Sequence, residues 1–259
     1  MYQYILYELS DNVAFIRLND PDTLNAWSTP MGLEVMDAFA RAESEARAIV
    51  LGSVGRAFCS GANLMGGTFD LSSPERDAGL ALEQVVNPFL VRLKRSELPV
   101  ITAVRGAAAG VGCGIALASD LIIAGESTFF YQAFCKVGLS PDGGSAYLLA
   151  KSIGRVRAME MMLLGSRLKA PQALDWGLVS RVVPDEMVDD TALSLARELA
   201  AGPKSLALIR QTAWAALDTP FEEQLENERV AQRDAGRTED FLEGIAAFKE
   251  KRPANFKGH

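Results

Sequence analysis

Hydrophobic residues follow two periods along this chain. Short apolar or alternating runs indicate β-strands, and longer stretches with apolar residues every three or four positions indicate helices. Residues 2–9 and 13–19 predict a β-hairpin, because Ser10-Asp11-Asn12 between them has the composition of a turn. Further strands are predicted over 48–51, 99–104, 121–124, 128–130 and 179–182. Helices are predicted over 30–47, 76–95, 112–119, 145–152, 156–164, 170–176 and 186–200.

Beyond residue 200 the pattern is helical alone. After the breaker Ala201-Gly202-Pro203, helices are predicted over 204–217, 220–235 and 238–251. Strands alternating with helices, followed by helices only, indicate an α/β fold with a helical C-terminal extension. We therefore divide the chain into a core domain, residues 1–200, and a C-terminal helical region, residues 201–259.

Charge and composition narrow the partners. The 259-residue chain carries a net charge of −7 and has no run of Lys and Arg, so we expect neither nucleic acid nor an anionic membrane as a partner. No apolar run approaches the ~20 residues that a membrane span requires. Residues 1–8 lack the basic start of a secretory signal, and we expect a cytoplasmic protein.

The cysteines and the single histidine exclude several kinds of site. Cys59, Cys113 and Cys135 are odd in number and lie among apolar residues, which favours reduced core thiols over disulfides or a zinc site. The histidine is His259, the last residue of the chain. Ser-His and Cys-His hydrolase mechanisms therefore lack their base, and no metal site is expected.

Two glycine-bearing junctions between a strand and a helix, over 58–64 and 106–114, are the first candidates for chemistry. Each alone is explained by a tight turn and close packing. Unpaired N–H groups at a helix N-terminus also suit a transient oxyanion, and if the junctions converge, the donors would be the amides of Ala62 and Val111. A dinucleotide fingerprint is not formed, because its third glycine would fall on Ile115.

Asp142, in Pro141-Asp142-Gly143-Gly144, is the third candidate. The local sequence favours a helix N-cap. The alternative is a proton-transferring carboxylate with a pKa raised from ~3.9 by an apolar pocket, whose walls could come from Phe129, Phe130, Phe134 and Leu139. A carboxylate beside an oxyanion site suits a carbonyl that becomes an enolate, such as a thioester.

These elements, together with Ala173-x-x-Trp176-Gly177-Leu178-Val179 and the tail over 248–256, resemble the enoyl-CoA hydratase/isomerase (crotonase) superfamily over nearly the whole chain. The resemblance implies a spiral of ββα units with a helical C-terminal trimerisation region, assembled as a homotrimer or hexamer. It also implies an acyl-CoA substrate whose thioester oxygen lies between the amides of Ala62 and Val111. Coenzyme A would enter as part of the substrate, and no further cofactor is implied.

Substrate contacts are predicted on the loops and helices that carry these motifs. They are Asn25, Ala26, Ala62, Leu64, Gly110, Phe134, Leu139, Phe248 and Lys251. Arg17 is a second hypothetical phosphate contact beside Lys251.

The departures from the family pattern bear on the reaction. Hydratases of this family carry glutamates at the positions held here by Gly114 and Phe134, so a hydration mechanism with two carboxylates loses both groups. Asp142 matches an aspartate of ring-epoxide isomerases of the phenylacetyl-CoA pathway and of some other acyl-CoA isomerases. We therefore predict an acyl-CoA isomerase in which Asp142 is the base, with the amides of Ala62 and Val111 as the oxyanion donors.

Three alternatives remain open. The first is an enoyl-CoA hydratase of fatty-acid or aromatic degradation. The second is a dehalogenase or thioester hydrolase with Asp142 as nucleophile, for which Phe134 is unfavourable because that class places a tryptophan there. The third is a homologue that binds acyl-CoA without turning it over.

Overall fold

The computed structural model describes residues 2–63 and 73–259. Six strands in this part of the chain form the main sheet, in the order β1-β2-β3-β4-β6-β9. They are β1 (Ile5–Ser10), β2 (Val13–Leu18), β3 (Ala48–Ser53), β4 (Val100–Val104), β6 (Leu121–Gly125) and β9 (Arg181–Val183). The predicted hairpin is confirmed, since β1 and β2 pair antiparallel and the other neighbours pair parallel. Asp11 and Asn12 adopt positive φ at its two-residue turn, as such turns require.

A second sheet has the order β5-β7-β8, formed by β5 (Ala107–Ala109), β7 (Phe129–Tyr131) and β8 (Arg167–Lys169). The sequence pattern did not predict β5 or β8. β5 follows β4 almost directly, and the chain leaves the main sheet at Gly106, whose φ of +57° is open to glycine. The strand predicted over 179–182 is present as β9, but its bounds are Arg181–Val183.

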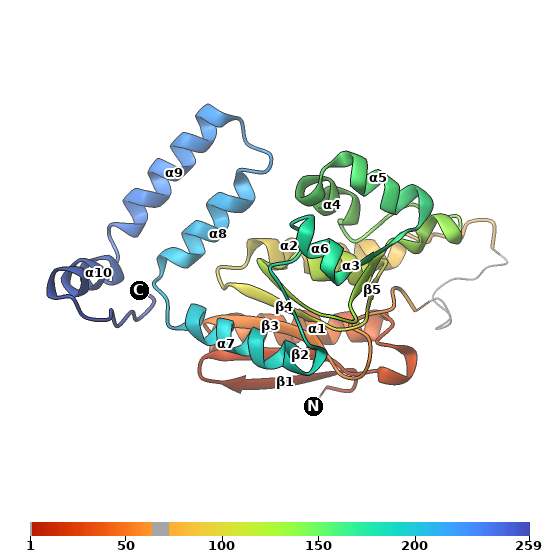
Figure 1. The fold of residues 1–259 in the computed structure, drawn as a ribbon, viewed down its shortest axis with the longest axis horizontal. Coiled ribbons are helices and arrows are strands. Elements are labelled where there is room, and N and C mark those ends of the chain that lie inside the picture. Colours follow the sequence, from red (N-terminus) through yellow and green to blue (C-terminus); the bar gives the residue numbers. More distant parts are fainter. Residues whose placement is uncertain (1, 64–72) are drawn as a thin grey trace.

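The main sheet is buried on both faces, as expected for parallel strands. On one face, Val50, Ile101 and Ile123 pack against α7 (Val188–Ala200). The alternate residues of the same strands belong to a larger core on the other face, which includes residues of α1 (Thr29–Glu45), α2 (Asn87–Arg95) and α3 (Val111–Leu117). Figure 1 shows these helices around the sheet.

The remaining helices follow the predicted order. They are α4 (Ser145–Ile153), α5 (Arg155–Leu164), α6 (Ala170–Asp175), α8 (Ser205–Ala215), α9 (Phe221–Ala235) and α10 (Glu239–Glu250). Short turns are η1 (Pro21–Thr23), η3 (Ala133–Lys136) and η4 (Asp185–Met187). The helix predicted over 76–95 begins later, at residue 80, and passes through a π-helical turn, η2 (Leu82–Val86), before α2.

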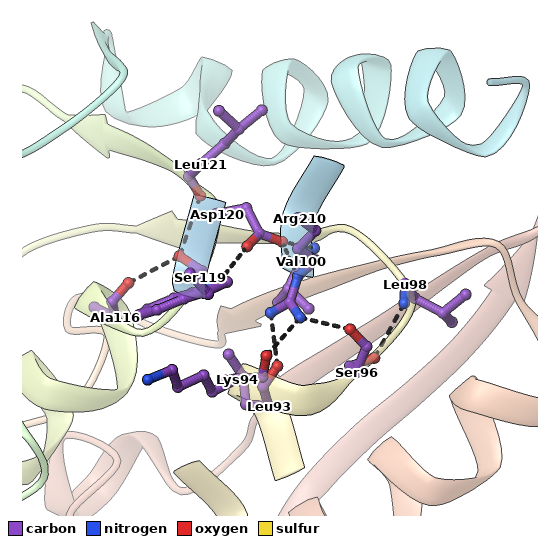
Figure 2. Close-up of polar contacts among 11 residues, drawn as sticks. Leu93, Lys94, Ser96, Leu98, Val100, Ala116, Ser119, Asp120, Leu121 and Arg210 are labelled. Atoms are coloured by element: carbon purple, nitrogen blue, oxygen red, sulfur yellow. Dashed lines mark hydrogen bonds and ion pairs between the residues drawn. The ribbon is translucent and has the colours of Figure 1, made fainter. Parts of the chain in front are cut away.

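The helices α8, α9 and α10 extend away from the core (Figure 1). One buried arginine of α8 fastens this region to the core (Figure 2). Arg210 donates to Asp120 Oδ2 at 2.6 Å and to the carbonyl oxygens of Leu93 at 2.6 Å and Lys94 at 2.9 Å. Carbonyl groups in the last turn of a helix have no intrahelical donor. Arg210 donates to those at the end of α2 and also pairs with the carboxylate of Asp120. The domain division at residue 200 stays a prediction.

No helix in the described ranges has the length and apolar character that a bilayer crossing demands.

Candidate active site

The two glycine junctions run side by side. Cys59 N–H donates to the carbonyl of Ala107 at 3.0 Å, and Ala109 N–H donates to the carbonyl of Cys59 at 2.9 Å. One residue further along, a Cβ atom on Gly110 would lie 3.7 Å from the Cα of Gly61. Both glycines have positive φ, and their lack of side chains allows the two turns to touch.

In the described part of the chain, this arrangement leaves the amide N–H groups of Ala62 and Val111 without an acceptor. Trp27 N–H donates to Gly61 O at 2.7 Å, and Asn63 N–H donates to Trp27 O at 2.9 Å, so the turn is held by the residues on either side of Ala62. Val111 is the first residue of α3, where an N–H has no intrahelical partner. Within the described residues, neither Ala62 N–H nor Val111 N–H donates a hydrogen bond.

Ala62 and Val111 both line a cavity of about 160 Å³. Six of the predicted site residues line it: Ala62, Gly110, Val111, Phe134, Leu139 and Asp142. Phe134 is held there by contact with the backbone, since its ring atom Cζ lies 3.5 Å from the Cβ position of Gly110. Phe129 and Phe130, also suggested as walls, do not line the cavity, and Phe130 is part of the core.

Much of the apolar wall of the cavity consists of residues that the sequence pattern did not assign to the site. The additional hydrophobic lining residues are Trp27, Ala78, Ala81, Leu82, Val85, Val86, Ala109, Ala133 and Val137. Those from 78 to 86 recur at helical spacing, and the same spacing is found for core residues such as Phe89 and Leu93. The apolar spacing therefore predicted a helix with a buried face. It did not show which residues of that face border a cavity and which border the core.

Asp142 is the one residue with a titratable side chain among the described residues of this wall. Its side chain does not cap α4. The N-cap position is Gly144, at φ of 71°, and Asp142 contributes only its backbone carbonyl, which accepts from Ser145 N–H at 3.0 Å. The interpretation of Asp142 as a helix cap, which the local sequence favoured, is therefore wrong.

The environment of Asp142 suits a base. Within residues 2–63 and 73–259, its Oδ1 is buried without a hydrogen-bond partner, and no hydrogen bond holds Oδ2. Desolvation by the surrounding apolar wall raises the pKa of Asp142 to about 6. A carboxylate tuned in this way is ionised at neutral pH and yet basic enough to accept a proton from carbon beside a polarised carbonyl.

Backbone contacts hold Asp142 beside the amide of Val111. A Cβ atom on Gly143 would lie 3.3 Å from the Cα of Val111, so the loop that carries the acid packs on the first turn of α3. The carbonyl oxygen of Gly143 also fills the place that a Cβ atom at Gly114 would need. The two amides and the carboxylate thus meet at one cavity, and the position of a hydratase glutamate on α3 is filled by backbone.

Two of the predicted contacts shape a loop outside the cavity wall. Asn25 is fully buried, and its Nδ2 donates to the carbonyls of Val54 at 2.9 Å and Ala57 at 2.8 Å. Its side-chain oxygen accepts from Asp20 N–H at 2.8 Å. Ala26 is buried next to it. Asn25 therefore fixes the chain just before Trp27, and its action on the site is indirect.

The remaining predicted contacts either are not part of the described cavity wall or fall outside the described residues. Leu64 is outside the described residues. Phe248, 83% exposed, and Lys251 lie at the end of α10 and are not among the residues that line the cavity. Arg17, on β2, forms an ion pair with Glu8. Substrate binding by Phe248, Lys251 and Arg17 stays a prediction. No cluster of three potential metal ligands occurs in the described ranges.

Comparison with known proteins defines the class. The family model described as enoyl-CoA hydratase/isomerase matches residues 8–259. The chain is 40% identical, over 100% of both chains, to a 1,2-epoxyphenylacetyl-CoA isomerase of Escherichia coli (strain K12). It is also 40% identical to a probable enoyl-CoA hydratase of Rhodobacter capsulatus, over 99% of each chain. The solved structure of a putative enoyl-CoA hydratase from Streptomyces coelicolor A3(2) has a TM-score of 0.92 at 35% identity, covering 100% of this chain and 96% of the other.

The chain therefore belongs to the enoyl-CoA hydratase/isomerase family and is an enzyme with the crotonase fold, as the sequence motifs predicted. The names of its relatives include both isomerases and hydratases, so they do not select the reaction.

Proposed function

We propose that this enzyme is an acyl-CoA isomerase that moves one proton with a single carboxylate. The observation that carries the proposal is that Asp142 is the sole titratable side chain of the described cavity wall and lines the same cavity as Ala62 and Val111, whose amides donate no hydrogen bond within the described residues. One base is sufficient when the proton removed at one carbon is returned at another. Hydration requires a second acid to activate water, and the described wall supplies none.

The reaction follows from these positions. The thioester oxygen accepts hydrogen bonds from Ala62 N–H and Val111 N–H. Asp142 takes a proton from C2 of a 3-enoyl-CoA, and the C–H electron pair moves into the dienolate, whose negative oxygen the amides stabilise. The proton then returns from Asp142 to C4, which leaves the double bond between C2 and C3. Each amide contributes on the order of 3 kcal/mol to the transition state, as in other oxyanion holes.

An epoxide or other strained ring next to the thioester is a second substrate for the same groups. The relative from Escherichia coli carries such a substrate in its name. In either case coenzyme A is part of the substrate and no further cofactor takes part. The expected homotrimer or hexamer is supported by large apolar side chains left exposed on α9 and α10, among them Phe221, Leu225, Leu242 and Phe248.

The test compares two reactions in wild type and Asp142→Asn. Conversion of 3-hexenoyl-CoA to 2-hexenoyl-CoA is expected in wild type and should fall by roughly 10²- to 10⁴-fold in the variant. Hydration of crotonyl-CoA should be negligible in both. Hydration as fast as isomerisation in wild type would instead establish a hydratase. A covalent acyl adduct seen by intact-protein mass spectrometry would establish Asp142 as a nucleophile, and full activity of the variant would remove Asp142 from the chemistry.

A further inference from the structure

One continuous segment of the apolar wall, residues 78–86, becomes more buried along the chain. Ala78 is exposed, Ala81 and Leu82 are half-buried, and Val85 and Val86 are each only 2% exposed. Leu139 and Val137, elsewhere on the wall, are 42% and 56% exposed. Ala78, Val137 and Leu139 therefore mark the exposed side of the cavity, and Val85 and Val86 belong to its buried side.

Val85 packs closely against α1. Behind it lies Gly32 of α1, where even a Cβ atom would overlap Val85 Cγ1 and would lie 3.0 Å from Trp27 Cζ2. Trp27 is itself fixed, because its ring stacks on Phe89 with centroids 5.9 Å apart. The backbone of α1 and the indole of Trp27, which is itself part of the cavity wall, therefore hold Val85 in place.

The backbone of Val85 is fixed in an unusual conformation. It belongs to the π-helical turn η2, where Asn87 N–H donates to the carbonyl of Leu82, five residues back. Pro88 follows and has no N–H to donate to Gln84, so the regular α-helical ladder is interrupted here. Single π-helical turns of this kind often occur at functional sites, and this one carries three of the cavity's lining residues.

We infer that Val85, supported by Gly32 and Trp27, sets the depth of the acyl pocket and confines the enzyme to compact acyl groups. A cavity of about 160 Å³ is close to the ~150 Å³ apolar cavity that holds one benzene molecule. The matching substrates are acyl groups of about six carbons, as a chain or a ring. This inference rests on the proposed function in assigning the cavity to the acyl group.

Binding of saturated acyl-CoAs tests the inference without turnover, because these ligands have no double bond to move. By titration calorimetry, wild-type affinity should rise about fourfold per methylene from butanoyl- to hexanoyl-CoA. It should then fall at least tenfold for dodecanoyl-CoA. Dodecanoyl-CoA binding as tightly as hexanoyl-CoA in wild type would overturn the inference.

Substitutions at Val85 should move this optimum in opposite directions. Val85→Ala lengthens the pocket and should shift the tightest ligand to octanoyl-CoA or longer, whereas Val85→Ile should shift it toward butanoyl-CoA. Val91→Ala is the matched control, since Val91 is exposed on the adjoining helix α2 and does not line the cavity. An unchanged chain-length profile in both Val85 variants would contradict the inference. Absence of isomerase activity together with the expected binding shifts would instead refute only the proposed reaction.

Discussion

The carbonyl oxygen of Gly143 occupies the place where a side chain of residue 114 would begin. Gly114 lies on α3, and Gly143 follows Asp142 on the loop before α4, so the contact couples the absence of a side chain on the helix to the position of the acid on the loop. A glutamate at position 114 and the present course of this loop exclude each other. With this backbone, the enzyme can carry an acidic side chain at position 142 of the loop, but it cannot also carry one at position 114 of α3.

Any side chain at position 114 should destabilise the fold. Gly114→Ala forces the loop or α3 to shift, and we expect a loss of about 1–3 kcal/mol in the free energy of unfolding, measured by urea denaturation. Gly244→Ala is the matched control. Gly244 also lies within a helix, α10, where a Cβ atom would meet only Phe256 at 3.6 Å, so this variant should gain about 0.5–1 kcal/mol. Equal stabilities for the two variants would show that the loop does not obstruct position 114.

The amide of Val111 can be removed by substitution. Val111→Pro deletes the N–H at the first position of a helix, which tolerates proline. We expect kcat for 3-hexenoyl-CoA to fall about 10²- to 10³-fold, as for the loss of other oxyanion donors. Val111→Ala keeps the N–H and should stay within a few-fold of wild type. If circular dichroism shows both variants folded and their kcat values agree, Val111 N–H is not an oxyanion donor.

The activity should depend on pH through Asp142. The reaction requires the carboxylate, and burial raises the pKa of Asp142 to about 6. The value of kcat/KM should therefore be level above this pH and decline about tenfold per unit below it. The pH profile of kcat/KM between 4.5 and 8.5 measures this directly. A decline centred near 4, the ordinary value for aspartate, would show that the carboxylate is well hydrated in the free enzyme.

The stability of the fold should also depend on the ionisation of Asp142, but it should fall where the activity rises. Because the folded-state pKa of Asp142 lies above the unfolded value of ~3.9, the ionised carboxylate destabilises the fold, fully above pH 6 and not at all below about pH 4. Asp142→Asn removes this cost, so its Tm should exceed that of wild type at pH 8. The difference should shrink as the pH falls toward 4. A constant difference across this range would contradict the pKa shift.

The attachment of α8 should depend on Arg210. Its side chain is 4% exposed and pairs with Asp120, so Arg210→Ala leaves buried carbonyls without their donor and Asp120 without its ion-pair partner. The expected loss in unfolding free energy is about 3–5 kcal/mol. Arg229→Ala serves as the control, because Arg229 pairs with Glu226 on the surface of α9, where solvent screens the pair and its contribution to stability is small. Unfolding of both variants in guanidinium measures their free energies of unfolding. If Arg210→Ala loses as little stability as Arg229→Ala, Arg210 does not anchor α8.

Periodicity was sufficient for the long elements and failed for short ones. The hairpin and most helices could be predicted because each has its own apolar pattern. β5 and β8, with sequences Ala-Ala-Ala and Arg-Leu-Lys, have no strand pattern, and only pairing with β7 makes them strands. Tertiary contacts therefore decided these two elements.

The site was predictable in its chemistry and less so in its walls. Ala62, Val111 and Asp142 could be found because glycine turns and an isolated acid are local signals. The cap interpretation of Asp142 failed because Gly143 and Gly144 both adopt positive φ, which moves the start of α4 beyond the reach of the carboxylate. Trp27 and Val85 had no local signal, since a buried apolar residue has the same pattern whether it borders core or cavity.

Hydrogen exchange at C2 of 3-hexenoyl-CoA in heavy water tests most directly whether Asp142 forms the enolate. Followed by NMR, the wild-type enzyme should replace C2 hydrogen by deuterium while it forms 2-hexenoyl-CoA. Asp142→Asn, folded and still able to bind hexanoyl-CoA, should do neither at a measurable rate. Exchange by Asp142→Asn at the wild-type rate would contradict the account.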